Sequence, residues 1–538
     1  MKKSFYFKTL MAVAFMIGIL STFPVSLLAA DNKTTDEPQT SIIEFAPQWN
    51  ESGTNFRHTW EGVSNVDQAF WLQHGNMQAQ LEIMRKDLNI KSVRAVSALD
   101  DIMRTYAEDP KGWREKERNP RANFRMIDEA FDALLKVGLN PMVTTCFMPK
   151  QMASGKEEVF RYGSSTPPKD YKEWGNFISN LTQHLIDRYG AEVVSKWDFE
   201  VWNEPNLGYF WKDANQAEFF KLWEVSYRAI KDVNSEVRVG GPSTARSEWI
   251  PDFLEYCRKN NCEPDYIICH IYNNDNEFAA LSPFDGPQSD KINQSPHFVT
   301  AVVKGARKQL NDLGYKGELM FNEWGRSWFP ADDIRETPNE AAFIAMTLAN
   351  CSQYADHMAY WCLSDIYDQA GYGLEAFYGG YGLMSLDGLK KPSYKAFQLL
   401  TKLGDKQVTV NTKNANIVRN GIATKNADGY QFLFYGFEKE YIVDEVAKKQ
   451  TISVLLPKGT IASKIEIYQI GSTENNILTE WKKMNKPSYP NKIQLSELYV
   501  HNALEKYTGP QKLEKTNLGI VLTFETEATG VAFVNIQK

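Results

Sequence analysis

The sequence predicts a (β/α)8 TIM barrel with a C-terminal β-sandwich domain, an α/β fold followed by an all-β one. Over residues 59–403, apolar runs of strand length alternate with amphipathic helices, and this alternation repeats eight times. Each parallel strand pair needs a crossover connection, so the repeated alternation indicates a closed parallel sheet. Short alternating runs replace the helices over residues 404–538, and the segment 31–58 ahead of the barrel could pair with the sandwich.

The helix and strand periods place the elements of the barrel. In the helix expected at 123–137, Phe124 and Ile127 follow the helical period, and Gly138 stands at the C-terminal cap position. A buried strand is expected directly after it, at 141–147. The other strands expected in the barrel are 58–64, 91–97, 197–203, 237–241, 265–271, 318–323 and 358–364, of which the first has the weakest pattern.

After residue 404 we find no helical period, and polar turns separate the strand-like runs. Repeated short strands of this kind are typical of a β-sandwich. The strands expected there are 407–411, 429–435, 451–456, 464–468 and 519–524. A strand-like run at 41–45 precedes the barrel and is the part of the N-terminal segment that could join the sandwich.

Residues 1–30 have the pattern of a secretory signal peptide. Basic Lys2 and Lys3 precede an apolar run at 10–20, and the small residues Ala29 and Ala30 offer a cleavage site. The run is too short to span a bilayer, and we find no longer one later in the chain. We therefore expect an exported, periplasmic or secreted protein without membrane insertion, and an uncleaved anchor is the alternative.

Composition excludes several classes of protein. The chain has 60 basic and 67 acidic residues, a net charge of −7 and a pI near 5.7, which argues against a nucleic-acid partner. Its six cysteines are too few for a disulfide scaffold, although Cys257 and Cys262 could either pair or remain free thiols. Phosphate-binding and zinc-binding motifs are absent, so no cofactor or metal is expected. The sequence does not indicate an oligomeric state.

Two carboxylates stand where a barrel places its catalytic groups, at the C-terminal ends of strands. Asn203 and Glu204 follow one predicted strand, and Glu323 ends another. Acetal hydrolysis needs two such groups facing each other, one to donate a proton and one to attack or to activate water. Asn203 could bond a sugar hydroxyl, and the aromatic residues around both glutamates suit the C–H faces of sugars.

Further residues are candidates for the same mouth. Arg94 is a charged side chain in an apolar strand and needs a carboxylate partner. The alternate spacing of His270 and Tyr272 puts both on one side of a strand, towards the barrel mouth. Trp361 ends the last predicted strand, and we expect its ring to stack on a sugar. Trp202 and Trp211 are further candidates for stacking, for which ordinary core packing is the alternative.

Several motifs resemble those of the glycoside hydrolase family 39 enzymes, best known as retaining β-xylosidases and α-L-iduronidases. The matching segments run in order over residues 56–405 and include Phe199-Glu-Val-Trp-Asn-Glu-Pro-Asn206, His270-Ile-Tyr272, Asn322-Glu-Trp324 and Tyr360-Trp-Cys-Leu-Ser-Asp365. The chain looks closer to the xylosidase branch.

The resemblance implies the same fold and a role for each candidate. It makes Glu204 the general acid/base and Glu323 the nucleophile. It places Asn203 on the sugar hydroxyl next to the anomeric carbon. Arg94, His270 and Tyr272 would surround the nucleophile and the glycone, the sugar ring that is released.

One departure from the family pattern concerns the sugar. The family typically has Arg-x-His-Gly, with the histidine facing the glycone, whereas this chain reads Arg94-Ala-Val-Ser97. Val96 cannot donate a hydrogen bond to a hydroxyl. Asp100, Gln73 and His74 are the residues that we expect could compensate.

The expected function is an exported retaining glycoside hydrolase that removes terminal glycosyl residues from oligo- or polysaccharides of the plant cell-wall type. An enzyme of the α-L-iduronidase type, an arabinose- or galactose-type exo-glycosidase and an inverting hydrolase are alternatives. A non-catalytic carbohydrate-binding protein is an alternative of another class, but it would not need both Glu204 and Glu323.

Overall fold

The structure is a computed structural model that describes residues 41–108, 120–275 and 295–538. The predicted signal peptide at residues 1–30 lies outside the described residues and stays a prediction. Within the described parts of the chain, every helix is too short or too polar to cross a bilayer.

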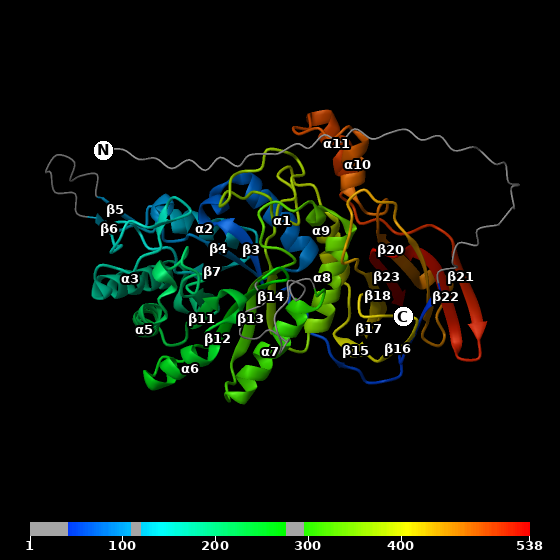
Figure 1. The fold of residues 1–538 in the computed structure, drawn as a ribbon, viewed down its shortest axis with the longest axis horizontal. Coiled ribbons are helices and arrows are strands. Elements are labelled where there is room, and N and C mark those ends of the chain that lie inside the picture. Colours follow the sequence, from blue (N-terminus) through cyan, green and yellow to red (C-terminus); the bar gives the residue numbers. More distant parts are fainter. Residues whose placement is uncertain (1–40, 109–119, 276–294) are drawn as a thin grey trace, which may run out of the picture. The chain divides into compact units, whose positions relative to one another are not determined.

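Eight parallel strands form the barrel, as predicted (Figure 1). Each strand pairs with the next along the chain, and the loop after the last strand meets the first, where the Leu363 N–H donates to the Asn65 carbonyl at 2.8 Å. The sheet is therefore closed on itself. In chain order the strands are β3 (Val63–Gln68), β4 (Ser92–Val96), β7 (Asn140–Thr144), β10 (Asp198–Glu200), β11 (Arg238–Thr244), β12 (Tyr266–Tyr272), β13 (Glu318–Gly325) and β14 (His357–Tyr360).

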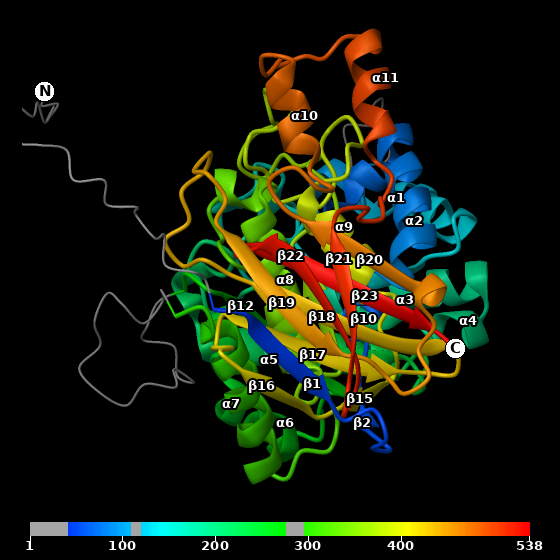
Figure 2. The same ribbon diagram turned by 90° about the vertical axis from the view of Figure 1, so that its right-hand side faces the viewer.

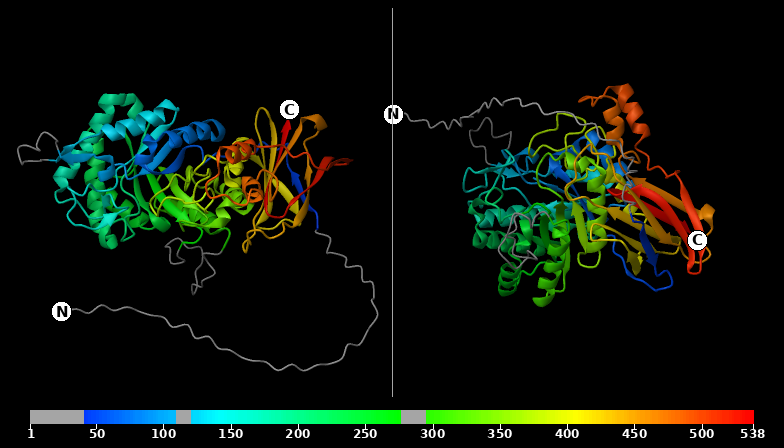
Figure 3. Two further views of the ribbon diagram at one scale, coloured as in Figure 1. Left: turned by 90° about the horizontal axis from the view of Figure 1, so that it is seen from above. Right: turned by 45° about the vertical axis from the view of Figure 1, so that its right-hand side comes forward.

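Helices connect successive strands and cover the outside of the barrel (Figures 1 and 3). The predicted helix at 123–137 matches α2, and Gly138 after it has a φ of 80°, the left-handed conformation in which glycine commonly ends helices. These helices are α1 (Gly75–Leu88), α2 (Arg125–Lys136), α3 (Tyr171–Tyr189), α4 (Ala191–Val194), α5 (Gln216–Lys231), α6 (Ile250–Lys259), α7 (Phe298–Asp312), α8 (Pro338–Cys351) and α9 (Pro392–Leu400).

The first barrel strand lies later in the chain than predicted. We expected it at 58–64, and the structure has β3 at Val63–Gln68. Asn65, Asp67 and Gln68 are polar but buried, so this strand lacks the apolar pattern by which the others were found. Buried polar side chains need hydrogen-bond partners: the Asn65 amide donates to the Asn322 carbonyl at 2.7 Å, and Asp67 accepts the Asp368 N–H at 2.7 Å.

The C-terminal region forms two sheets packed face to face (Figure 2). One sheet has the order β16-β1-β19-β22-β21, and the other has the order β2-β15-β17-β18-β23-β20. Buried side chains such as Phe45, Phe432 and Phe524 fill the space between them. The strands are β1 (Ile43–Pro47), β2 (Thr54–Asn55), β15 (Lys406–Val408), β16 (Val410–Lys413), β17 (Arg419–Lys425), β18 (Gly429–Gly436), β19 (Lys449–Leu455), β20 (Ile465–Ile470), β21 (Gln511–Thr516), β22 (Gly519–Glu527) and β23 (Gly530–Gln537).

The segment before the barrel contributes to both sheets of the sandwich. β1 runs antiparallel to β16 and parallel to β19, and β2 pairs with β15. The chain thus begins its described part in the sandwich, forms the barrel, and returns to the sandwich.

Two helices interrupt the sandwich, where the sequence predicted strands and turns alone. The prediction was wrong for α10 (Ile477–Lys483) and α11 (Lys492–Val500), which are too short to show a clear apolar period. Their starts are marked by Asn476 and Asn491, whose side chains accept the first backbone N–H groups. They pack on the loop between β14 and α9, where the rings of Phe377 and Trp481 lie 5.1 Å apart.

The loops after β4 and β7 each contain a pair of short antiparallel strands. β5 (Tyr106–Glu108) pairs with β6 (Pro120–Ala122), and β8 (Glu158–Val159) pairs with β9 (Gly163–Ser164).

The sequence left open whether Cys257 and Cys262 pair or remain thiols. In the structure both carry free, buried thiols.

Candidate functional site

The barrel brings Glu204 and Glu323 together at the C-terminal ends of β10 and β13. One carboxylate oxygen of Glu204 lies within 4.8 Å of one oxygen of Glu323. The backbone around Glu204 is unusual, with φ values of 69° at Trp202 and 44° at Glu204. Left-handed conformations at residues other than glycine are costly and cluster at functional sites. The Glu204 N–H donates to the Ser243 carbonyl at 2.8 Å, which ties this turn to the neighbouring strand β11.

Arg94 links the carboxylates at the base of the mouth. Its guanidinium, fully buried on β4, donates to Glu323 Oε1 at 2.7 Å and to Glu200 Oε2 at 2.5 Å. A third bond, at 2.6 Å, runs from Arg94 Nη2 to Asn203 Oδ1. Because Arg94 uses the amide oxygen of Asn203, the amide nitrogen is the group left to donate to a substrate.

Sequence reasoning missed Glu200, the second partner of Arg94. It lies four residues before Glu204, and its carboxylate also accepts bonds from Thr144, Ser243 and Asn322. The available signal was a glutamate in the strand that directly precedes the Asn203-Glu204 pair. Glu200 neutralises part of the positive charge that Arg94 brings into the barrel.

His270 and Tyr272 both contact the glutamate pair from β12. His270 Nδ1 lies 3.0 Å from Glu204 Oε1 and 3.5 Å from Glu323 Oε2. The Tyr272 hydroxyl donates to Glu323 Oε2 at 3.1 Å. The structure thus places both on one side of the strand, facing the mouth. Glu323 receives hydrogen bonds from Arg94 and Tyr272, whereas Glu204 has His270 as its side-chain neighbour.

The charged groups of the mouth depend on one another for their protonation. Burial and the charge of Glu204 raise the pKa of Glu323, while His270 and Arg94 act against that rise. Burial lowers the pKa of His270, but the two glutamates outweigh burial and leave this pKa raised. Burial raises the pKa of Glu200, but Arg94 lowers it by more, so this pKa lies below its usual range. Glu200 therefore stays charged, and the two glutamates of the mouth favour the protonated form of His270.

The spacing of Glu204, His270 and Glu323 would also suit a metal ion, since all three lie within 4.8 Å of one another. Arg94 already donates to Glu323 and adds a positive charge there. A divalent cation would have to compete with this guanidinium. The arrangement suits the sharing of protons better than the binding of a metal.

The structure separates the tryptophans that the sequence proposed for stacking. Trp361 is 5% exposed at the mouth, with the rings of Tyr367 and Tyr381 at 6.4 and 6.5 Å. Trp202 and Trp211 are fully buried, pack against each other with ring centroids 5.0 Å apart, and cannot present a face to a sugar. The stacking hypothesis was wrong for these two residues, because they complete the core behind the Glu204 turn.

Val96 is buried at the end of β4, two residues after Arg94. Asp100, one of the residues expected to compensate for it, is fully buried and accepts the Ile102 N–H at 3.3 Å. The side-chain nitrogen of Gln73 lies 3.7 Å from the sulfur of Met103. The ring of His74 packs edge-on against Trp71.

The buried carboxyl of Asp100 leads to a prediction about stability. Burial raises its pKa to about 8, whereas the pKa of an aspartate in an unfolded chain is about 4. The fold therefore favours the protonated form, and this contribution to stability is lost as the pH rises from about 4 to about 8. We expect Asp100→Asn, which keeps the helix cap, to flatten the fall of the thermal midpoint between pH 5.5 and 8.

Thermal melts over this pH range measure the effect. The matched control is Asp213→Asn at the surface, which should leave the fall of the midpoint unchanged. Equal pH dependence in wild type and Asp100→Asn would contradict the prediction.

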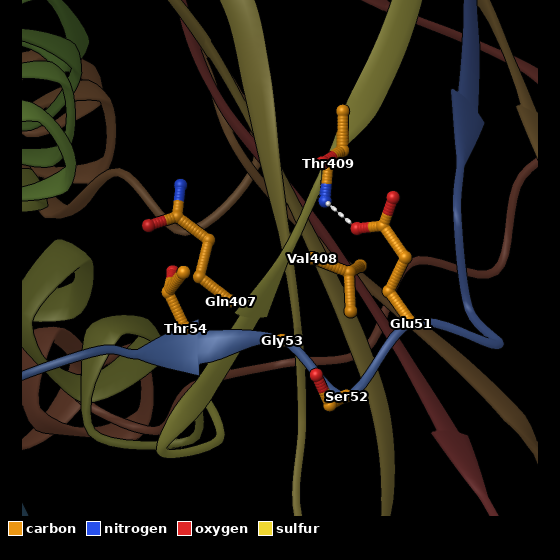
Figure 4. A pocket seen from close by; sticks show the side chains of 7 residues that line it. All are labelled: Glu51, Ser52, Gly53, Thr54, Gln407, Val408 and Thr409. Atoms are coloured by element: carbon orange, nitrogen blue, oxygen red, sulfur yellow. Dashed lines mark hydrogen bonds between the residues drawn. The ribbon is translucent and has the colours of Figure 1, made fainter.

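A depression elsewhere on the molecule lacks the pair of carboxylates found at the barrel mouth. It has a volume of about 590 Å³ and is lined by residues 51–54 and 407–409, beside the pairing of β2 with β15 (Figure 4). Glu51 is the one acidic residue in its lining, and its carboxylate accepts the Thr409 N–H at 3.1 Å. A single, engaged carboxylate does not provide the two groups that acetal hydrolysis needs.

Comparison with known proteins gives one consistent family. The family model described as glycosyl hydrolases family 39 matches residues 45–511. A β-xylosidase of Caldicellulosiruptor saccharolyticus is 32% identical over 444 residues, covering 82% of this chain and 86% of that protein. A β-xylosidase of Geobacillus stearothermophilus is 31% identical over 425 residues, covering 78% of this chain and 81% of that protein.

Solved structures agree with the family and the fold. The crystal structure of a monomeric β-xylosidase from Caulobacter crescentus CB15 superposes with a TM-score of 0.78 at 26% identity, covering 92% of this chain and 99% of that one. The predicted barrel with its C-terminal sandwich is therefore confirmed, and so is the resemblance found in the motifs. The chain belongs to glycosyl hydrolase family 39 and is a glycosidase of this retaining family.

Proposed function

We propose that this protein is an exported enzyme that removes terminal sugars from glycans by double displacement, with Glu323 as nucleophile and Glu204 as general acid/base. The observation that carries the proposal is the close approach of the two carboxylates, within 4.8 Å, at the barrel mouth. Retaining enzymes need carboxyl groups about 5–5.5 Å apart, because no water has to fit between the nucleophile and the sugar. Inverting enzymes need about 6.5–9.5 Å.

In the first step, Glu323 attacks the anomeric carbon while Glu204 protonates the oxygen of the leaving group. Two positively polarised donors, Arg94 and Tyr272, favour the ionised form of Glu323. In this mechanism Glu323 attacks as the ionised carboxylate, and Glu204 carries the proton that it donates. The glycosidic C–O bond breaks as the ester bond to Glu323 forms, and the released alcohol carries the proton from Glu204.

In the second step, water takes the place of the departed alcohol. Glu204, now ionised, accepts a proton from this water as its oxygen attacks the anomeric carbon. The ester bond to Glu323 breaks, and the sugar leaves with its original configuration. His270 lies within 3.5 Å of both carboxylates and can stabilise whichever of them is charged.

Binding of the glycone would involve Asn203 and Trp361. The amide nitrogen of Asn203 can donate to the hydroxyl next to the anomeric carbon, since Arg94 holds the amide by its oxygen. Trp361 lies at the end of β14, beside Tyr367 and Tyr381, where its ring can stack on the C–H face of a sugar.

The substrate proposal starts from the two relatives, which are named β-xylosidases. We infer a pentose or related sugar of plant cell-wall glycans as the glycone. Val96 replaces the family's histidine, so the discrimination that a hydrogen-bond donor provides is missing at this point. We therefore propose a differently configured or substituted glycone, of the arabinose or galactose type, as the preferred substrate over plain xylose.

We therefore expect weak hydrolysis of a simple β-xyloside and faster hydrolysis of another member of a chromogenic panel covering xylose, arabinose, glucose, galactose and uronic acids. Val96→His should shift the preference towards xylose, because it restores the donor. The ratio of kcat/KM values across the panel measures this. Vigorous and selective β-xyloside hydrolysis by the wild type, or an unchanged profile in Val96→His, would contradict it.

Export is part of the proposal and rests on residues 1–30. The basic start, the apolar run and the small residues before Asp31 support cleavage at that point. Mass spectrometry of the mature protein from culture medium or periplasm should find a chain that begins at Asp31. A chain that retains residues 1–30 in the membrane fraction would show the anchored alternative instead.

A further inference from the structure

The turn that ends α6 holds two of the six cysteines of the chain. The Cys262 N–H donates to the Cys257 carbonyl at 2.9 Å, and the Asn261 N–H donates to the Arg258 carbonyl at 3.4 Å. Asn261 has a φ of 52°, in the left-handed region. These two hydrogen bonds and the left-handed residue make up a Schellman motif, in which the side chains at the positions of Cys257 and Cys262 commonly pack on each other.

The two thiols contact each other, as this motif predicts. The Cys257 thiol donates a hydrogen bond to Cys262, and both side chains are fully buried. The other four cysteines each interact with a serine or a threonine: Cys146, Cys269, Cys351 and Cys362. An apolar pair of any kind would satisfy the motif, so a pair of cysteines at these two positions points to a bond between them.

The pair is enclosed by the neighbouring helices. Trp223 of α5 donates through Nε1 to the Cys262 carbonyl at 3.1 Å and contacts both thiols. On the other side, Arg258 donates to the Leu313 carbonyl at the end of α7 at 2.9 Å. An oxidant or reductant in solvent therefore does not reach the sulfur atoms of the folded protein. A bond between them has to form while the chain folds, and the fold then protects it.

We propose that Cys257 and Cys262 form a disulfide in the exported enzyme, which fastens the end of α6 to the turn that leads into β12. The inference goes beyond the glycosidase activity and rests on the proposed function only for export. Disulfides form and persist in oxidising compartments such as the periplasm and the medium. The oxidant is the disulfide of a thiol oxidoreductase or of glutathione.

The bond forms by two exchange steps, after the turn has formed and before α5 covers it. The hydrogen bond from Cys257 lowers the pKa of Cys262, which favours Cys262 as the attacking thiolate. It bonds to one sulfur of the oxidant and displaces the other as a thiolate. The Cys257 thiolate then attacks the Cys262 sulfur and displaces the second thiolate. The two displaced thiolates take up the two protons that the cysteines lose, so the oxidant is reduced to two thiols.

The disulfide would stabilise the fold without touching the barrel mouth. Cys262 leads into the N-terminal end of β12, whereas His270 and Tyr272 act near its C-terminal end. The bond closes a loop of six residues and so restricts the unfolded chain. We expect the thermal midpoint of the oxidised protein to lie about 2–5 °C above that of the reduced protein. The kcat/KM of the two forms should agree within about twofold.

Peptide mapping of the exported enzyme tests the bond directly. Protein from culture medium or periplasm is treated with N-ethylmaleimide to block free thiols and digested with trypsin without reductant. Cleavage after the basic residues of the turn separates the two cysteines, so the disulfide should link the peptides 247–258 and 260–291. Fragmentation should place the link on Cys262 and not on Cys269. N-ethylmaleimide on both Cys257 and Cys262 would overturn the proposal.

A second preparation separates this inference from a failure of export. Residues 31–538 are produced in bacteria with an oxidising cytosol and, in parallel, in bacteria with a reducing one. A full-length chain that stays in the cell would contradict the proposed export, and the oxidising preparation would then decide on the cysteines. Linked peptides in that preparation would support the pair, and two labelled thiols would overturn it.

Thermal melts of the two preparations assign the effect to this pair. Wild type and the matched control Cys351→Ser, which alters a buried thiol beside Thr300, should both have the higher midpoint after oxidising production. Cys262→Ser should have the same midpoint in both preparations, because Cys257 has lost its partner. A difference between preparations that persists in Cys262→Ser would show that other cysteines cause it and would overturn the assignment.

Discussion

Replacing Glu323 with alanine is expected to abolish hydrolysis of every glycoside, whereas Glu204→Ala should spare substrates whose leaving group needs no proton. The nucleophile forms the covalent intermediate with any substrate, so its loss cannot be offset by a better leaving group. General acid catalysis contributes about 10²–10⁴-fold. Glu204→Ala should therefore lose about this factor on an unactivated disaccharide and much less, in the first step, on a 2,4-dinitrophenyl glycoside.

Azide distinguishes the two variants further. In Glu204→Ala the glycosyl ester on Glu323 persists because no base activates water, and azide can attack it without losing a proton. We expect azide to raise the turnover of this variant and to give a glycosyl azide of retained configuration. Glu323→Ala has no ester for azide to attack with that outcome. If Glu204→Ala were equally inactive on activated and natural substrates, its acid/base role would be in doubt.

Arg94→Met is expected to have the second largest effect, on both stability and activity. Removal of the guanidinium leaves the buried carboxylate of Glu200 without its charge partner, and breaking a buried ion pair in this way costs about 3–5 kcal/mol. Glu323 loses a donor as well, which disfavours the ionised form needed for attack. Urea unfolding followed by tryptophan fluorescence and kcat/KM on an aryl glycoside measure the two effects.

Two comparisons make the Arg94 prediction specific. Arg188→Met removes the partner of Asp132 in an exposed pair and should cost less than about 1 kcal/mol. Adding Glu200→Met to Arg94→Met removes the unpaired charge, so it should recover part of the stability but none of the activity. Equal stability of Arg94→Met and wild type would show that the buried pair does not need the arginine.

The barrel and its two glutamates could be predicted because they follow local patterns. Helical and strand periods are set by which side chains face the core, and the catalytic candidates stand at strand ends. The first strand was predicted too early in the chain, because Asn65, Asp67 and Gln68 of β3 are polar although they are buried. Glu200 was missed for a related reason, because its role depends on Thr144, Ser243 and Asn322, which come from three other strands.

Other parts of the site depend on contacts that no local pattern shows. Trp202 and Trp361 both follow strand-like runs, yet one is enclosed by the rings around it and the other lies at the mouth. The helices α10 and α11 are stabilised by packing against the β14 to α9 loop, through Trp481 and its neighbours. Tertiary packing of this kind outweighs the weak helical pattern of short segments.

The most direct test of the central claim is to trap the covalent intermediate. A 2-deoxy-2-fluoro glycoside with a good leaving group slows both steps, and hydrolysis of the ester slows enough for it to accumulate. Tryptic digestion and fragmentation should place the added sugar mass on Glu323 in the peptide 317–326, and not on Glu318 in the same peptide. A label on Glu204 in the peptide 197–212, or no label in an enzyme that is inactivated, would contradict the assignment of Glu323 as nucleophile.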